Sequence, residues 1–132
     1  NISTINSFLD QAKVSINTGN LDDALEKLGQ ARKNSKLLID YYKDLHTSFT
    51  GIDALIPREL TEKNRNVIQL LAKANMQLAI IHRSQGEHEL AVPLLVEVVK
   101  ILTPVNPRGA KAYQQLVELG LVETPYRGAP KQ

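Results

Sequence analysis

Apolar residues recur at helical spacing along most of the chain, in stretches separated by glycine and proline. The clearest stretch covers residues 78–95, where an apolar stripe stands on each side of Gly86. A glycine in such a place is typical of a helix end, so the pattern predicts two helices that fold back on each other. A weaker copy of the arrangement surrounds Gly19. The sequence therefore predicts an all-α fold built from helical hairpins.

The same spacing predicts an antiparallel bundle of about five helices. Asn20 and Asn106 are placed to cap the second and fifth helices, and Pro57 and Pro107 suit first helical positions. Residues 50–56 are expected to form a turn. The expected helices cover residues 4–18, 21–49, 57–85, 87–102 and 107–119.

The second predicted helix has an apolar stripe that no proline interrupts. Its members follow one another mostly at intervals of three or four residues: Leu21, Ala24, Leu25, Leu28, Ala31, Ser35, Leu38, Ile39, Tyr42, Leu45 and Phe49. The second and third helices therefore form a long hairpin, about 45 Å in length. The first and fourth helices are about half as long and pack at the hairpin's glycine end. The other end is therefore expected to project and expose apolar side chains, unless the fifth helix or another subunit covers it.

Composition fits one folded domain over residues 1–122, followed by an extended or flexible tail at 123–132. The chain has 132 residues, of which 42% are hydrophobic and only 5% are aromatic, so its core is expected to consist of Leu, Ile, Val and Ala. Its formal net charge of +2 is too small to indicate an electrostatic field that attracts nucleic acid or a membrane surface.

Targeting and redox signals are sparse. The chain contains no cysteine and no apolar run near the roughly 20 residues that span a bilayer, so neither a disulfide framework nor membrane insertion is expected. Because the first residue is Asn1 and not methionine, the chain is expected to be an excised domain or a processed product. A cytoplasmic location is the working expectation.

Residues around the Gly86 corner resemble a known repeat. Leu78-Ala79, Gln85-Gly86-Glu87 and the run from Leu90 to Leu95, which includes Pro93, resemble the tetratricopeptide repeat in its kinesin-light-chain-type variant. Near Gly19 the match is looser. A helix that begins later, with Pro93 in its first turn, is the alternative explanation for this proline.

The resemblance implies stacked helical hairpins that bind peptides, helices or other domains, and it transfers no site residue by position. The two corner glycines are 67 positions apart, close to two 34-residue repeats, but two long helices lie between them. The first hairpin also resembles microtubule-interacting-and-trafficking three-helix domains.

Catalytic and metal-binding patterns are absent from the sequence. His82 and His88 lie six residues apart across a corner, which is not the spacing of a helical metal site, and structural or solvated roles are favoured. Asp22, Asp23 and Glu26 are explained by charge at a helix start. There is no glycine-rich phosphate loop and no Gly-x-Ser-x-Gly motif. We expect no enzyme activity and no cofactor.

The favoured hypothesis is a non-enzymatic adaptor or scaffold module that binds a protein or peptide partner. Tyr41 and Tyr42 are adjacent and cannot both face the core, so one is expected at the surface. Arg32, Lys36 and Lys43 form a basic stripe on the second predicted helix and would steer an acidic partner. The expected contact residues are Arg32, Lys36, Tyr41, Tyr42, Lys43, His46, Phe49, Ile52 and Ile56. Two alternatives stay open: a homo-oligomeric assembly subunit, and, less favoured, a helical RNA-binding module that uses the basic stripe.

Overall fold

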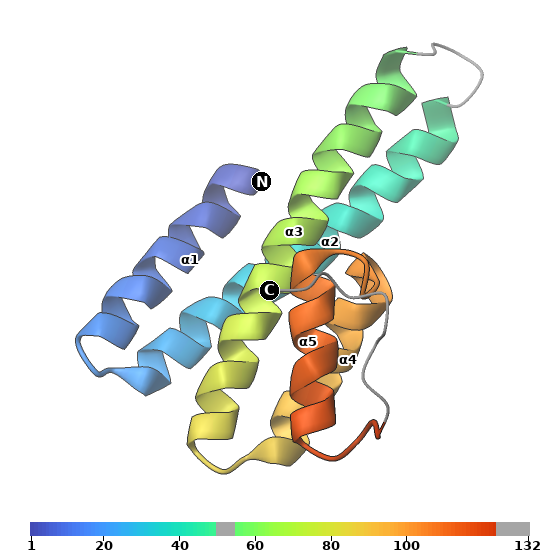
Figure 1. Ribbon diagram of the computed structural model, residues 1–132. Helices are drawn as coiled ribbons and strands as arrows, with labels where there is room; N and C mark the ends of the chain where they lie inside the picture. Colours follow the sequence, from blue (N-terminus) through green and yellow to red (C-terminus); the bar gives the residue numbers. More distant parts are fainter. Residues whose placement is uncertain (50–54, 124–132) are drawn as a thin grey trace. The chain divides into compact units, whose positions relative to one another are not determined.

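The computed structural model describes residues 1–49 and 55–123, with the side chains of 55–57 left out of the description. All regular structure in these residues is helical, and the predicted all-α class is confirmed (Figure 1). The five helices are α1 (Ile2–Asn17), α2 (Leu21–Phe49), α3 (Leu55–Ser84), α4 (His88–Leu102) and α5 (Pro107–Glu118). None of the described helices is long and apolar enough to cross a bilayer.

Helix ends follow the predicted capping residues closely. The side-chain oxygen of Asn20 accepts a hydrogen bond from the Asp23 N–H at 3.2 Å, and that of Asn106 accepts one from the Arg108 N–H at 3.0 Å. Both bonds satisfy first-turn N–H groups that have no partner within their helix. The glycines after α1, α3 and α5 all have positive φ, between 76° and 81°. The predicted corners are thus the observed ones.

Two predicted helix starts were wrong by two residues. Helix α1 begins at Ile2 because Asn1 serves as its N-cap, with its side chain accepting a hydrogen bond from the Thr4 N–H at 2.9 Å. Helix α3 begins at Leu55, so Leu55 and Ile56 are helical and Pro57 is the third helical residue. A proline in the first turn is tolerated there because its missing N–H has no intrahelical acceptor to lose.

Pro93 lies inside α4, at its sixth residue. The alternative of a later helix start is therefore wrong. Pro93 and Glu89 are both exposed, so the carbonyl that loses its i+4 donor at residue 89 lies at a solvated part of the helix.

The chain divides into two compact units, Asn1–Leu71 and Ala72–Gln132, and α3 contributes its first part to unit 1 and its last part to unit 2. The single domain over 1–122 stays a prediction, and the tail expected at 123–132 falls, after Glu123, outside the described residues. In unit 1, α1 packs against α2. The buried apolar residues of unit 1 are Ile5, Leu9, Ala12, Ala24, Leu28, Ala31, Leu60, Val67 and Leu71.

Unit 2 packs α4 and α5 together with the end of α3. Its core contains mostly small and branched residues: Ala72, Ala79, Ala91, Leu95, Val98, Ala112 and Leu116. Asn75 is fully buried and its side-chain amide donates to the Leu94 carbonyl at 3.2 Å and to Glu97 Oε1 at 2.8 Å. These bonds fix the register of α3 against α4 within this unit, because a shifted helix would leave a buried amide without acceptors.

Candidate binding surface

Burial along α2 changes at its middle. In residues 21–35, which we call the inner half, Ala24, Leu28, Ala31 and Ser35 are all 0% exposed. In residues 36–49, the outer half, no residue is buried. The apolar stripe nevertheless continues through the outer half, where its members are only half-buried: Leu38, Ile39, Tyr42, Leu45 and Phe49.

The length of α1 explains this change. Helix α1 has 16 residues and α2 has 29, so at 1.5 Å per residue they are about 24 and 44 Å long. Helix α1 ends and α2 begins at the Gly19 corner, and the two helices pack side by side. The 16 residues of α1 therefore reach along α2 from Leu21 to about Lys36. Beyond that level α1 has no residues left to cover α2. The predicted difference in length between the first two helices is confirmed, and it leaves part of a core-type stripe half-covered.

One pocket opens on the outer half, between α2 and the first part of α3, and holds about 320 Å³. Its lining residues all belong to unit 1: Tyr42, Lys43, His46, Thr47, Leu60, Thr61 and Asn64. Among these described lining residues, Lys43 is the one lysine or arginine and none carries a carboxylate. The pocket therefore combines a cation with aromatic and aliphatic walls.

Hydrogen-bonding capacity in this pocket is unevenly used. Thr47 Oγ1 donates to the Lys43 carbonyl of its own helix at 3.0 Å, and His46 and Thr61 are also engaged in interactions within the chain. Asn64 Oδ1, in contrast, is buried and accepts no hydrogen bond. A buried acceptor without a donor costs about 1–3 kcal/mol. Because less than 1 Å² of this oxygen is exposed, a ligand with a hydrogen-bond donor would remove the cost once the Asn64 side chain turns toward the pocket.

The outer half of α2 has two distinct flanks. One flank carries the pocket and a row of basic residues. At about 100° per residue, the members of this row fall within about 40° of arc: Arg32, Lys36 and Lys43. Tyr41 points about 100° away from Tyr42, and the two ring centroids are 6.5 Å apart. Tyr41 is 59% exposed and Tyr42 is half-buried, so the prediction that the two tyrosines do not both face the core, and that one lies at the surface, is confirmed.

The predicted contact residues are thus divided. The pocket brings together Tyr42, Lys43 and His46, which is a grouping that the periodicity of α2 alone did not reveal. Arg32 is half-buried and Lys36 exposed, and each is engaged in an interaction within the chain. Phe49 is half-buried at the last residue of α2. Ile52 and the side chain of Ile56 lie outside the described residues.

Sequence reasoning missed five residues of this region, one of which, Thr47, lines the pocket from α2. Leu60, Thr61 and Asn64 complete the pocket from α3, and they could have been found only by aligning the two helices of the hairpin. Leu37 is 61% exposed and lies one turn before Tyr41, a spacing that was readable in the sequence.

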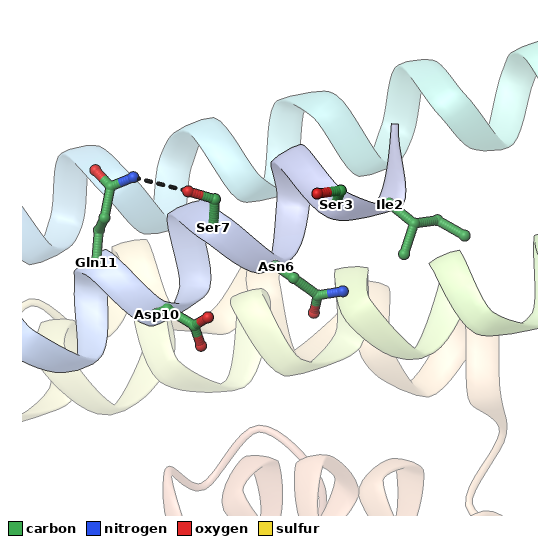
Figure 2. Close-up of a pocket in the computed structure, with 6 residues that line it drawn as sticks. All are labelled: Ile2, Ser3, Asn6, Ser7, Asp10 and Gln11. Atoms are coloured by element: carbon green, nitrogen blue, oxygen red, sulfur yellow. Dashed lines mark hydrogen bonds between the residues drawn. The ribbon is translucent and has the colours of Figure 1, made fainter.

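Two further hollows are less suited to a partner. One lies on α1 alone, among Ile2, Ser3, Asn6, Ser7, Asp10 and Gln11, where Gln11 Nε2 donates to Ser7 Oγ at 3.0 Å (Figure 2). This is the polar face opposite the buried residues of α1, and no second element of the described chain lines it. The other lies in unit 2 beside Arg83, whose guanidinium already donates to Gln115 at 3.1 Å and Glu118 at 3.2 Å.

The three histidines, all within the described residues, belong to no group of side chains that could hold a metal ion. His82 is mostly buried and its Nδ1 lies 3.3 Å from Glu87 Oε1, which ties the end of α3 to the start of α4, while His88 is exposed. Among the residues that the structure describes, no three His, Asp or Glu side chains gather closely enough to hold a metal ion.

Comparison with known proteins adds no relative. No family model, no curated protein and no solved structure matches the chain. The resemblance to the tetratricopeptide repeat therefore stays a prediction.

Proposed function

We propose that the chain is a non-enzymatic interaction module of the adaptor or scaffold type, which binds a protein or peptide partner on the outer half of α2. The observation that carries this proposal is the half-covered apolar stripe between Leu38 and Phe49. Burying apolar surface is worth about 25 cal/mol per Å², so a partner that completes this burial gains affinity directly.

The pocket on the same half indicates the chemistry of the partner. Lys43 favours a carboxylate or a backbone carbonyl, while the buried Asn64 Oδ1 favours an N–H donor. A peptide segment with an acidic side chain offers both kinds of group, and its apolar neighbours can contact Tyr42 and Leu60. We therefore expect the partner to present a short acidic and apolar segment.

Affinity capture tests the proposal. The intact chain is used as bait beside Lys43→Glu and Asn64→Ala variants, with Val14→Ser as the matched control, because Val14 is 63% exposed on α1. The expected result is a partner retained by the intact chain and the control, and weakened at least tenfold by Lys43→Glu in calorimetry with the purified partner. Equal affinity of all four proteins would place the binding surface elsewhere and contradict the proposal.

Association kinetics separate steering from contact. If Lys43 steers an acidic partner, Lys43→Glu lowers the association rate constant several-fold at low salt, and the difference shrinks at high salt. Loss of the contact made by Asn64 raises the dissociation rate instead. A Lys43→Glu effect that is independent of salt would dismiss the steering role.

A further inference from the structure

Leu37 and Tyr41 form an exposed apolar pair on the flank of α2 that faces away from the pocket. They are 61% and 59% exposed, and one helical turn separates them. Among the large hydrophobic residues that are exposed in the described part of the chain, no other two have this spacing on one helix. Side chains at i and i+4 lie on the same helix face and present a continuous apolar surface.

Charged residues flank this pair in a definite order. Lys33 lies one turn before Leu37, and Asp44 lies about one turn after Tyr41. Both charged side chains are exposed. At about 100° per residue, Lys33, Leu37, Tyr41 and Asp44 fall within about 80° of arc, and we call these four residues the α2 strip. The strip is positive at its N-terminal end, apolar in the middle and negative at its C-terminal end.

This order is self-complementary. We propose that the α2 strip is the docking surface for a second copy of this chain, with the two α2 helices antiparallel. A two-fold axis level with Ile39 places Leu37 opposite Tyr41 of the second copy. The same axis brings Lys33 to within one residue of the level of Asp44 of the second copy, which is about 1.5 Å along the helix and within reach of a lysine side chain.

The opposite orientation is disfavoured by the same charges. In a parallel pair Lys33 would lie opposite Lys33, and Asp44 opposite Asp44, so like charges would face each other at both ends. The antiparallel pair has one kind of attractive contact, between Lys33 and Asp44 of the second copy, which the two-fold symmetry repeats to give two. The charge order thus selects both the partner and its direction.

The size of the strip sets the strength of the dimer. A contact between two single helices over about three turns buries well under the roughly 1,200 Å² that a stable interface needs. We therefore expect a weak dimer, with a dissociation constant above roughly 10 µM. Such an affinity suits an assembly that forms when the chain is concentrated locally.

Analytical ultracentrifugation of the whole chain, between about 10 µM and 1 mM, tests the proposal. The expected average mass rises from 14.7 kDa toward twice that value with concentration. The variant with both Leu37→Ser and Tyr41→Ser stays monomeric throughout, while circular dichroism shows unchanged helix content. A wild-type chain that is monomeric at 1 mM, or a double variant that still dimerises equally well, would overturn the proposal.

Charge swapping tests the orientation. Lys33→Glu or Asp44→Lys alone is expected to raise the dissociation constant by about fivefold to thirtyfold, because each turns both attractive contacts into repulsive ones. The double variant Lys33→Glu with Asp44→Lys regains near wild-type affinity only if the helices are antiparallel. Single variants without effect, or a double variant weaker than both, would overturn the antiparallel pair.

The proposed partner binding and the proposed dimer can be tested independently of each other. Lys43→Glu alters the pocket flank, so it should weaken partner capture and leave the concentration dependence of the mass unchanged. The variant with Leu37→Ser and Tyr41→Ser should do the reverse. A single variant that abolishes both would indicate one shared surface and contradict the separation into two flanks.

Discussion

The inner and outer halves of α2 share one apolar periodicity and differ in how much of it is covered. Leu28, in the inner half, is 0% exposed, whereas Leu45, in the outer half, is half-buried. The difference begins near Lys36, where α1 ends beside α2. Periodicity therefore determines which face of a helix is apolar, and the length of the neighbouring helix determines how much of that face is removed from water.

The largest expected change in the free energy of unfolding is at Leu28, compared here with Leu45 of the same apolar stripe. Leu28→Ala should lower the free energy of unfolding by about 3 kcal/mol or more, because it leaves a cavity in a fully buried site. Leu45→Ala should lower it by about 1 kcal/mol, because part of that side chain is already in water. Urea denaturation measures both. Equal losses would mean that the two halves are equally covered.

A second comparison uses two hydroxyl groups. Ser15 is buried, and its Oγ donates to Asp23 Oδ2 between α1 and α2, so Ser15→Ala should cost about 1–2 kcal/mol. Thr47, in the outer half, is exposed and donates to the Lys43 carbonyl of its own helix. Thr47→Ala should change the free energy of unfolding by no more than about 0.5 kcal/mol. A loss from Ser15→Ala as small as that from Thr47→Ala would contradict the assignment of α1 as the cover.

A smaller change in stability, of opposite sign, is expected at Gly29 on the exposed side of the inner half. Gly29 is helical and exposed, and a Cβ added there would have no atom within 4 Å. Gly29→Ala should raise the midpoint of urea denaturation, by the equivalent of about 0.5–1 kcal/mol. The contrasting control is Gly109→Ala in α5, where the added Cβ would lie 1.8 Å from the Thr103 carbonyl oxygen and should destabilise unit 2.

The smallest effect is expected on the exposed flank. Leu37→Ser should change the stability of the monomer by less than about 0.5 kcal/mol, because the leucine is 61% exposed. Thermal denaturation at a concentration of a few micromolar, well below the expected dimer range, measures this. A loss above 1 kcal/mol would show that Leu37 packs within the chain and is not available to a second copy.

Local signals in the sequence accounted for the number of helices, their corners and the difference in length between the first two. Asn20, Asn106 and the corner glycines gave the clearest of these signals, because caps and positive φ act through residues that are neighbours in sequence. The starts of α1 and α3 were misplaced. Asn1 was overlooked as a cap, and Pro57 was read as the first helical residue although a proline is tolerated anywhere in the first turn.

The pocket was less predictable than the helices. Tyr42, Lys43 and His46 were identified from α2, but the residues that face them from α3 depend on how the two helices align along their length. A shift of one turn, about 5.4 Å, would exchange Asn64 for a different neighbour.

Native-state hydrogen exchange along α2 is the most direct test of the difference between the halves. At low protein concentration, we predict that the amides of Leu28 and Ala31 exchange only through global unfolding, whereas those of Tyr42 and Leu45 exchange through local openings of markedly lower free energy. Protection that stays uniform from Leu28 to Leu45 would mean that the outer half is as well covered as the inner half, and would contradict the account of α2 as part core and part binding surface.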